Sequence, residues 1–450
     1  MLFRSAMKLL MVSLGCDKNL VDSEEMTGIL LKRGLEFTDD EAEADIIIVN
    51  TCAFIGDARE ESINTIIELG EYKTGGRRNG RCKALIVTGC LAQRYSEEIK
   101  KELPEVDAVV GTTAYDEIGR VIDSALKGEK SFILKDINRS PAITGERLLS
   151  TGGHYAFLKI AEGCDKRCTY CIIPFMRGRY RSFPMEELLE EAKRLADMSV
   201  KELILVAQET TVYGMDICGK KLLPELIRGL AAIDGIEWIR LMYCYPEEIT
   251  DELIEVIRNE PKVCHYLDIP IQHASDDILR AMGRKTDEAS LRKLIGKLRR
   301  RIPDIAVRTT LISGFPGETE EDFVKLYNFC DEMEFDRLGV FTYSEEEGTR
   351  AAELDGKIPP ETAERRRDEL MELQREIAFE KARAQKGRRL KVFIEGRLVD
   401  EGVYVGRTYM DAPGVDGMIF VDSERELISG SFEEVTVTGA DNYDLIGEIV

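Results

Sequence analysis

Three cysteines in one short run have the spacing of an iron–sulfur ligand set. Cys164, Cys168 and Cys171 are separated by three and by two residues. Three thiolates can bind three irons of a four-iron cubane and leave the fourth iron without a protein ligand. An open iron indicates a place where a substrate or cofactor binds. The alternative is a zinc knuckle or unrelated buried thiols, but zinc usually takes four protein ligands. His154 precedes the loop and no second cysteine pair lies nearby, so the spacing favours iron and sulfur.

Three more cysteines occupy equivalent places in the N-terminal part of the chain. Each follows an apolar run that reads as a buried strand: Cys16 after 9–14, Cys52 after 45–50 and Cys90 after 84–88. Parallel strands end at the same edge of a sheet, so these thiols are expected to converge there. Cysteines are also good core residues, but three in one topological position predict a second metal site. Cys82 precedes its strand and is expected at the opposite edge.

The elements around these N-terminal cysteines predict a doubly wound α/β domain over residues 7–143. A further buried strand is expected at 108–110, and helical spacing occurs at 21–33 and 59–69. Alternation of buried strands with helices is typical of a parallel sheet that is covered on both faces. Residues 138–153 are rich in Gly and polar residues and are expected to form a linker or a surface crossover.

The second segment, 154–386, predicts a partial (β/α)6 barrel. Strands are expected at 156–161, 203–207, 238–243, 265–269, 306–312 and 338–343, and helices at 186–198, 223–233, 291–301 and 320–332. Six strand–helix units form a barrel that stays open where eight would close. The cysteine run follows the first of these strands, at the sheet edge where such folds place their sites. Residues 361–385 are expected to form a long amphipathic helix.

The third segment, 387–450, predicts a small antiparallel β-barrel that is OB-like in size. Short β-like runs are expected at 390–394, 403–409, 418–421, 434–438 and 443–449. From Leu390 onward four Lys and Arg stand against thirteen Asp and Glu. A barrel of this kind often binds nucleic acid, but this one is strongly acidic.

Length and composition indicate a multidomain globular protein of a reducing compartment. The chain has 450 residues, eleven cysteines and a net charge of −22. Such a chain buries a core without disulfides, so metal-bound thiolates in the cytoplasm are the expected use of its cysteines. The acidity favours a basic protein partner over nucleic acid. The apolar run 9–15 is short for a signal peptide, so Met7 is a plausible start, and no segment approaches a membrane span.

The combined motifs resemble one enzyme family. A cubane with one open iron on a partial barrel is similar to the radical S-adenosylmethionine enzymes. With an N-terminal cysteine domain and a C-terminal TRAM barrel, the chain resembles the methylthiotransferases, and within them the RimO-type branch. The motifs that carry the resemblance are Ser-Leu-Gly-Cys-Asp-Lys-Asn at 13–19, Val-Asp-Ser-Glu at 21–24, Asn-Thr-Cys at 50–52, Thr-Gly-Cys at 88–90, Asp-Ile-Pro-Ile-Gln-His-Ala-Ser-Asp at 268–276, Gly-Phe-Pro-Gly-Glu-Thr at 314–319 and Asp-Ala-Pro-Gly-Val-Asp-Gly at 411–417.

The resemblance implies two 4Fe–4S clusters and S-adenosylmethionine as cofactors. Cys164, Cys168 and Cys171 would hold the radical cluster, and Cys16, Cys52 and Cys90 would hold an auxiliary cluster that presents sulfur. RimO-type enzymes methylthiolate the β-carbon of an aspartate in small-subunit ribosomal protein S-twelve, which is then the expected partner, alone or within the small subunit. An electron donor such as flavodoxin or ferredoxin is implied as a second partner. The unactivated C–H bond explains the need for radical chemistry.

Other residues are candidates for contact with S-adenosylmethionine. Tyr170 lies inside the cysteine loop and could pack near adenine, or only wedge the loop. Gln208 and Glu209 follow the second barrel strand, where many radical enzymes carry a Gly-Gly-Glu grip for the methionine amino group. Gly314 could approach the nucleoside or only form a turn. For His273, a structural role and a role in the functional site are equally expected.

Three arginines and two other functions complete the expectations. Arg177, Arg179 and Arg181 are interpreted as a solvated basic loop in preference to a binding cluster. A MiaB-like tRNA adenosine methylthiotransferase is the alternative function, and it would favour Lys and Arg in the terminal barrel. A non-catalytic iron–sulfur scaffold or redox sensor that binds ribosomes is a third hypothesis, which needs neither an open cofactor pocket nor a radical barrel.

Overall fold

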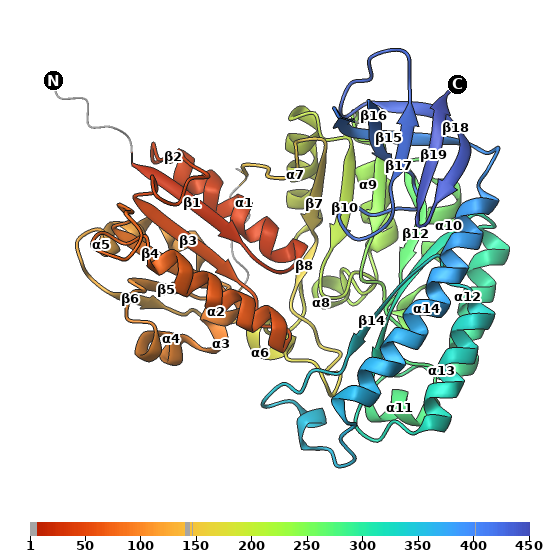
Figure 1. Ribbon diagram of the computed structural model, residues 1–450, viewed down its shortest axis with the longest axis horizontal. Coiled ribbons are helices and arrows are strands. Elements are labelled where there is room, and N and C mark those ends of the chain that lie inside the picture. The colour runs from red at the N-terminus through yellow and green to blue at the C-terminus, as the bar shows by residue number, and fades with distance from the viewer. Residues whose placement is uncertain (1–6, 140–144, 146, 401) are drawn as a thin grey trace. The chain divides into compact units, whose positions relative to one another are not determined.

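The computed structural model describes residues 7–139, 145, 147–400 and 402–450 (Figure 1). Two compact units make up the fold. The first unit comprises Met1–Ser150, Ala161–Glu187 and Ser344–Thr349, and the second comprises Thr151–Ile160, Leu188–Tyr343 and Arg350–Val450. Both sets of three cysteines therefore belong to the first unit. Residues 1–6, which precede the proposed start at Met7, and residues 140–144 and 146 of the expected linker lie outside the described part of the chain.

The first unit contains a six-stranded parallel sheet in the order β2-β1-β3-β4-β5-β6. The strands are β1 (Lys8–Ser13), β2 (Glu36–Phe37), β3 (Ile46–Thr51), β4 (Ala84–Gly89), β5 (Ala108–Val110) and β6 (Ser131–Ile133). The central strands β3 and β4 are buried along their whole length, as expected for uninterrupted apolar runs covered on both faces. The short edge strands β2 and β6 were not expected from the sequence.

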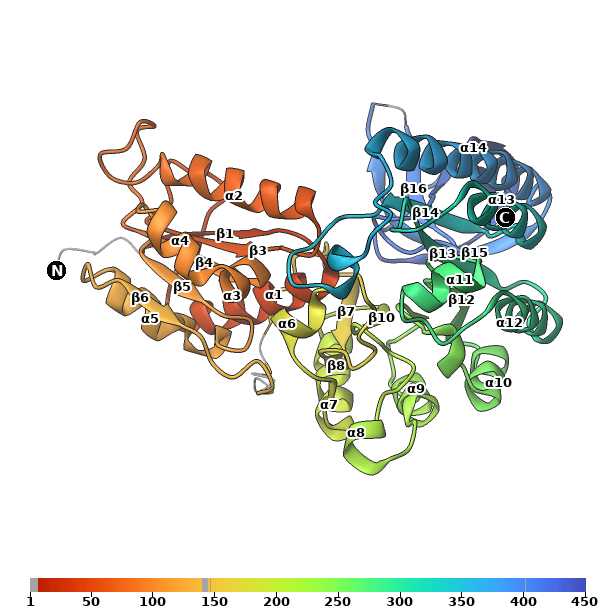
Figure 2. The ribbon, with the colours of Figure 1, turned by 90° about the horizontal axis from the view of Figure 1, so that it is seen from below.

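Helices cover both faces of this sheet, which confirms the doubly wound prediction. The helices are α1 (Asp17–Leu31), α2 (Gly56–Gly70), α3 (Cys90–Arg94), α4 (Ser96–Glu102) and α5 (Ile118–Ala125), with a 3-10 turn η1 (Tyr115–Glu117). Alternate residues of β3 divide the core: Ile46 and Ile48 pack with α1 and α5, whereas Ile47 and Val49 pack with α2, α3 and α4. Figure 2 shows α2 and α5 on opposite sides of the sheet.

The second unit contains a six-stranded parallel sheet in the order β14-β13-β12-β11-β10-β7. The strands are β7 (Tyr155–Lys159), β10 (Glu202–Val206), β11 (Trp238–Leu241), β12 (Val263–Asp268), β13 (Ala306–Ser313) and β14 (Arg337–Thr342). The main helices are α7 (Met185–Asp197), α9 (Leu223–Ala231), α10 (Asp251–Asn259), α12 (Glu288–Arg301), α13 (Glu320–Met333) and α14 (Pro360–Ala384), with short α8 (Met215–Cys218), α11 (Asp276–Ala281), η2 (Pro246–Glu248) and η3 (Arg350–Glu353). The six strands and the long α14 match the predicted open barrel.

Local signals set the starts of these helices. Asp287 and Ser290 form a reciprocal capping box at the start of α12, and Thr319 and Asp322 form another at α13. Thr250 caps α10 through its hydroxyl, which accepts from the Leu253 amide. The capping box at Asp287 explains why α12 begins at Glu288, three residues before the predicted start at 291.

The C-terminal segment forms a closed five-stranded barrel. Its strands are β15 (Arg389–Leu398), β16 (Val403–Arg407), β17 (Ile419–Asp422), β18 (Phe432–Asp441) and β19 (Asp444–Ile449), in the order β15-β16-β17-β19-β18. All neighbouring pairs are antiparallel except β17 and β19, which are parallel. A closed ring with an odd number of strands cannot alternate direction throughout, so one parallel pair is required in what was predicted as an antiparallel barrel.

Buried ion pairs join this barrel to the β/α sheet within the second unit. Glu202 at the start of β10 accepts from Arg240 Nε at 2.8 Å and from Arg407 Nη2 at 2.7 Å. The Asp-Ala-Pro-Gly motif supplies Asp411 to Arg337 and Asp416 to Arg308. The carboxylates of Glu202, Asp411 and Asp416 are almost wholly removed from solvent, and Arg308 and Arg337 are partly buried. This motif therefore serves contact between the two barrels.

No helix in the described ranges combines the length and the apolar character that a membrane crossing requires.

Candidate metal centres

Cys16, Cys52 and Cys90 come together at one edge of the first sheet. They follow β1, β3 and β4, which are adjacent in the sheet and parallel. The sheet order reverses beside β1, and doubly wound sheets place ligands at such a switch point, outside the carboxyl ends of the strands. The thiols are close enough for electrostatic interaction with one another. The predicted convergence is therefore present.

Buried side chains fix the backbone around these three thiols. The Asn19 side-chain nitrogen Nδ2 donates to Leu14 O at 3.0 Å and to Thr51 O at 2.8 Å, and the Asn50 side chain donates to the Asn19 backbone carbonyl at 2.8 Å. The Ser62 hydroxyl of α2 accepts from the Cys52 amide at 3.0 Å and donates to the Cys52 carbonyl at 2.9 Å. These paired side chains fix the backbone that carries Cys16 and Cys52.

Two glycines provide the space that the thiols need. At Gly15, φ is +86° and an added Cβ would lie 2.6 Å from Cys52 Cβ and 2.9 Å from its Sγ. At Gly89, φ is +91° and ψ is −154°, and an added Cβ would lie 2.3 Å from Asn50 Oδ1 and 2.6 Å from Thr51 O. Both glycines directly precede a cysteine of the set, so the Gly-Cys pairs are steric requirements of this edge.

The electrostatics of the three thiols suit a cationic cluster. Burial raises the pKa of Cys90 to about 12; the charge of Arg177 opposes this, while the Cys16 and Cys52 thiols add to it. Burial and then the neighbouring Cys16 thiol raise the pKa of Cys52. Thiolates gathered in one buried place repel one another, and a bound metal removes that cost because a coordinating thiol is deprotonated outright.

The second set of cysteines lies on a loop that is closed at its base. Strand β8 (Ala161–Glu162) pairs with β9 (Arg181–Ser182), so the residues between them form a closed loop. Cys164 and Cys168 are buried and Cys171 is half-buried. The Cys164 amide donates to Gly178 O at 3.2 Å, and the Cys171 amide donates to Cys168 O at 3.1 Å. These backbone contacts shape the closed loop that carries the three cysteines.

Across the described ranges, no three His, Cys, Asp or Glu side chains are gathered as ligands of a single metal ion. A cubane is held differently, because each of its three thiolates binds a different iron. Two sets of three largely buried cysteines, each without a fourth cysteine in the set, fit that demand. Cys82 is buried before β4, where its thiol donates to Ala84 O, at the opposite end of the strand from Cys90.

The basic residues after the cysteine loop do not form a solvated patch. Arg177 ends α6 (Ile173–Arg177) and is 3% exposed, with ion pairs to Asp22 at 2.7 Å and to Glu162 at 3.1 Å. The prediction of a solvated loop was wrong for this residue. Arg179 is exposed as predicted, and Arg181 is partly buried. The burial of Arg177 depends on Asp22 of α1, which lies 155 residues away in the sequence.

The candidates for cofactor contact on the second sheet lie at the carboxyl ends of its strands. Gln208, half-buried, and Glu209, buried, follow β10. Glu209 Oε1 accepts from the Thr211 amide at 3.1 Å and from the Thr211 hydroxyl. Gly314 follows β13. Tyr170 is half-buried in the cysteine loop of the first unit.

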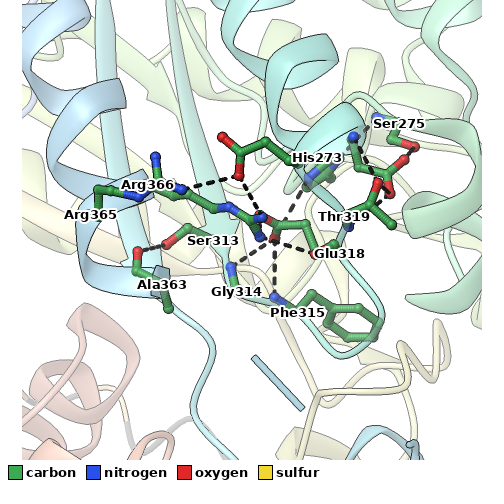
Figure 3. Close-up of polar contacts among 12 residues, drawn as sticks. His273, Ser275, Ser313, Gly314, Phe315, Glu318, Thr319, Ala363, Arg365 and Arg366 are labelled. Atoms are coloured by element: carbon green, nitrogen blue, oxygen red, sulfur yellow. Dashed lines mark hydrogen bonds and ion pairs between the residues drawn. The ribbon is translucent and has the colours of Figure 1, made fainter. Parts of the chain in front are cut away.

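The turn at Gly314 is held by the buried carboxylate of Glu318 (Figure 3). Glu318 Oε2 accepts from the Gly314 amide at 2.7 Å and from the Phe315 amide at 3.2 Å, and Oε1 accepts from Arg366 of α14 at 2.9 Å. At Gly314 φ is +74°, and an added Cβ would lie 2.3 Å from Ala363 Cβ. The close approach of α14 therefore accounts for glycine at this position.

His273 is a buried, neutral histidine beside this turn (Figure 3). Its side chain has no exposed surface, and Nδ1 accepts from the Ser275 amide at 2.9 Å. Nε2 lies 3.9 Å from Glu318 Oε2 without a hydrogen bond. Burial lowers the pKa of His273 to about 3. Of the two roles weighed from the sequence, these contacts favour the structural one.

Family models match three parts of the chain. The Radical SAM superfamily matches residues 158–330, the Uncharacterized protein family UPF0004 matches residues 8–111 and the TRAM domain matches residues 387–450. The class that the parallel sheets, the closed barrel and the cysteine loop define is the radical S-adenosylmethionine enzymes.

Relatives narrow the class to one family. The chain is 63% identical over 98% of its length to the ribosomal protein uS12 methylthiotransferase RimO of Lachnoclostridium phytofermentans, of which 99% is covered. It is 53% identical over 98% of its length to the protein of the same name from Acetivibrio thermocellus, of which 97% is covered. The chain belongs to the RimO family of methylthiotransferases.

Solved structures agree with the fold. The radical S-adenosylmethionine methyltransferase TsrM from Kitasatospora setae, with cobalamin and a 4Fe–4S cluster bound, has a TM-score of 0.55 at 14% sequence identity, over 77% of this chain and 74% of that chain. The same enzyme with tryptophan and an S-adenosylmethionine analogue has a TM-score of 0.53 over 75% and 73%, also at 14% identity. At this identity the likeness extends to the fold alone.

Proposed function

We propose that this protein methylthiolates the β-carbon of an aspartate in ribosomal protein uS12. The observation that carries the proposal is the identity of 63% along the whole chain to a RimO methylthiotransferase. The two sets of three cysteines, both in the first unit, supply the ligands that the reaction needs. The domain ranges 7–143, 154–386 and 387–450 belong to the same proposal.

Six cysteines would hold two 4Fe–4S clusters, Cys164, Cys168 and Cys171 the radical cluster and Cys16, Cys52 and Cys90 the auxiliary cluster. When bound, the reduced radical cluster with S-adenosylmethionine supplies the abstraction of hydrogen, the auxiliary cluster supplies sulfur, and a second S-adenosylmethionine supplies the methyl group. The protein binds and orients these groups and excludes water. Burial of four of the six thiols and the fixed backbone around Cys16 and Cys52 support that role.

Contacts to S-adenosylmethionine are proposed for Tyr170, Gln208, Glu209 and Gly314. Gln208, Glu209 and Gly314 share the carboxyl edge of the second sheet, where β/α barrels place their sites. The Gly314 amide donates to Glu318 Oε2 and Glu209 Oε1 accepts from the Thr211 amide, so both positions are held in place at this edge.

The acidic terminal barrel supports a basic protein substrate over tRNA. The charged side chains of Arg407, Asp411 and Asp416 are buried against the β/α sheet. Without them, three basic and eleven acidic residues remain in the sequence from Leu390 onward. Phosphate binding requires the opposite charge. We place the protein in the cytoplasm, with the ribosomal protein, and infer an electron donor of the flavodoxin or ferredoxin type.

The test offers both substrates to the same enzyme. The protein, reconstituted without oxygen and supplied with sulfide, reductant and S-adenosylmethionine, should exchange one hydrogen of uS12 for a methylthio group, as measured by mass spectrometry. Unmodified tRNA from the same mixture is the control. Modified tRNA with untouched uS12 would replace the proposal with the MiaB-like alternative.

A further inference from the structure

Arg177 is held rigidly at the end of the cysteine loop. It is the last residue of α6 and lies six positions after Cys171. The preceding carbonyl, Met176 O, accepts from the Thr112 hydroxyl at 2.8 Å. Gly178 follows with φ +73°, and an added Cβ there would lie 2.5 Å from Ile137 O. The chain around Arg177 is therefore anchored on both sides within the first unit.

Every nitrogen of the Arg177 guanidinium donates to a buried group. Nε donates to Cys90 Sγ at 3.4 Å, and Nη1 donates to Asp22 Oδ2 at 2.7 Å and to Glu162 Oε2 at 3.1 Å. Nη2 donates to the Asn19 side-chain oxygen. A planar guanidinium presents such a fork in fixed directions, and a lysine ammonium does not.

The partners of Arg177 lie close in the sequence to cysteines of both sets. Glu162 lies in β8, two residues before Cys164, and Asn19 and Asp22 lie in α1, directly after Cys16. Cys90 is itself one of the three N-terminal thiols. A single side chain that comes from the loop of one set thus donates a hydrogen bond to a sulfur of the other set.

We propose that Arg177 is a positioning residue of the auxiliary cluster, which orients Cys90 and raises the reduction potential of that cluster through its N–H···S hydrogen bond. This role rests on the proposed function of Cys90 as a cluster ligand. Hydrogen bonds to the ligand sulfurs and the local charge are two of the factors that set iron–sulfur potentials, and a donated N–H stabilises the more negative, reduced state.

A purely structural ion pair is the competing role, and Arg177→Lys separates the two. Lysine keeps the positive charge between the buried carboxylates, so the fold is expected to survive, but its single ammonium cannot reach Asp22, Glu162 and Cys90 together. Arg179→Lys is the matched control, because the Arg179 side chain is 75% exposed. Glu162→Gln provides a change of opposite sign, since it removes one negative charge beside the same guanidinium.

The experiment measures the midpoint potential of each cluster alone by anaerobic redox titration with electron paramagnetic resonance. Protein with Cys164, Cys168 and Cys171 changed to Ala keeps the auxiliary cluster, and protein with Cys16, Cys52 and Cys90 changed to Ala keeps the radical cluster. Arg177→Lys should shift the auxiliary potential to more negative values and the radical potential less. Glu162→Gln should shift the auxiliary potential to more positive values, and Arg179→Lys should shift neither.

The outcomes separate this role from the function on which it rests. An auxiliary cluster that is present with an unchanged potential in Arg177→Lys, or equal shifts in both clusters, would overturn the role of Arg177 alone. Absence of iron from the protein that retains Cys16, Cys52 and Cys90 would overturn the ligand set, and the role of Arg177 with it.

Discussion

The replacement Gly89→Ala should remove the auxiliary cluster and leave the radical cluster in place. Gly89 ends β4 and directly precedes Cys90. Its φ of +91° and ψ of −154° lie in a region that is essentially restricted to glycine. An added Cβ would lie 2.6 Å from Thr51 O and 2.8 Å from Thr51 N, both of them backbone atoms that cannot rotate away.

The size of the effect follows from two contributions. The strained backbone costs about 1–3 kcal/mol in a residue other than glycine. The Cβ must also move by roughly 1 Å to reach ordinary contact at about 3.5 Å, and such overpacking costs about 1–3 kcal/mol more. The total is about 2–6 kcal/mol, and the movement falls on Cys90 or on the Asn50 and Thr51 end of β3, next to Cys52.

Gly128→Ala is the matched control for this prediction. Gly128 has φ +80° and no neighbouring atom within 4 Å of an added Cβ, so only a backbone cost of about 1–2 kcal/mol applies. Iron analysis after anaerobic reconstitution should find about eight irons per chain in the control and about four in Gly89→Ala, since each cubane holds four. Full iron content in both variants, with equal denaturant midpoints, would refute the steric argument.

Three further results are expected. Cys168→Ala should abolish deoxyadenosine formation, whereas Cys52→Ala should spare it and stop sulfur transfer to uS12; product analysis showing sulfur transfer by Cys52→Ala would remove the auxiliary site. Glu202→Gln should lower the free energy of unfolding by about 3–5 kcal/mol, because two buried arginines lose their shared carboxylate. The control, Glu252→Gln at the exposed pair with Arg228, should lower it by less than about 1 kcal/mol. Equal denaturant midpoints for the two variants would contradict this. His273 has a pKa of about 3 in the folded protein and about 6.5 in the unfolded chain, so between these values only the unfolded chain takes up the proton. The free energy of unfolding should therefore fall by up to about 1.4 kcal/mol per pH unit as the pH drops below about 6.5. His273→Gln should reduce the pH dependence of the denaturant midpoint between pH 6.5 and 5, and an unchanged pH dependence would contradict the burial argument.

The strands and the cysteine sites were predictable because they depend on local pattern and topology. Uninterrupted apolar runs located β1, β3 and β4 to within one residue at each end. Parallel strands then placed Cys16, Cys52 and Cys90 at one edge, whatever the order of the strands. The open barrel followed in the same way from six alternating units. The edge strands β2 and β6 escaped prediction because two or three residues carry no periodicity.

The burial of Arg177 could not be predicted, because it depends on partners from distant parts of the chain. A run of three arginines next to a loop is usually solvated, and only the assembly of α1, β8 and α3 brings carboxylates and a thiol to this one. The steric reason for glycine at position 314 could not be predicted either, because its neighbour Ala363 belongs to α14, which is distant in the sequence. One local signal was available for Arg177, a glycine that directly follows it and ends a short helix.

The acidic terminal barrel shows the limit of counting charge along a sequence. The Asp-Ala-Pro-Gly-Val-Asp-Gly motif indicated the family, but the sequence did not predict which residues the motif contacts. In the structure Asp411 and Asp416 bind arginines of the β/α sheet, so the motif joins two domains and adds nothing to the charge that a substrate meets. The remaining acidic residues still outnumber the basic ones, and the preference for a basic partner is unchanged.

The central claim is that two separate sets of three cysteines each hold one cubane. The most direct measurement is the iron content of three proteins after anaerobic reconstitution: the unchanged chain, the chain with Cys164, Cys168 and Cys171 replaced by Ala, and the chain with Cys16, Cys52 and Cys90 replaced by Ala. We predict about eight, about four and about four irons per chain, at four per cubane. About four irons in the unchanged chain, or complete loss of iron in either variant, would contradict the claim.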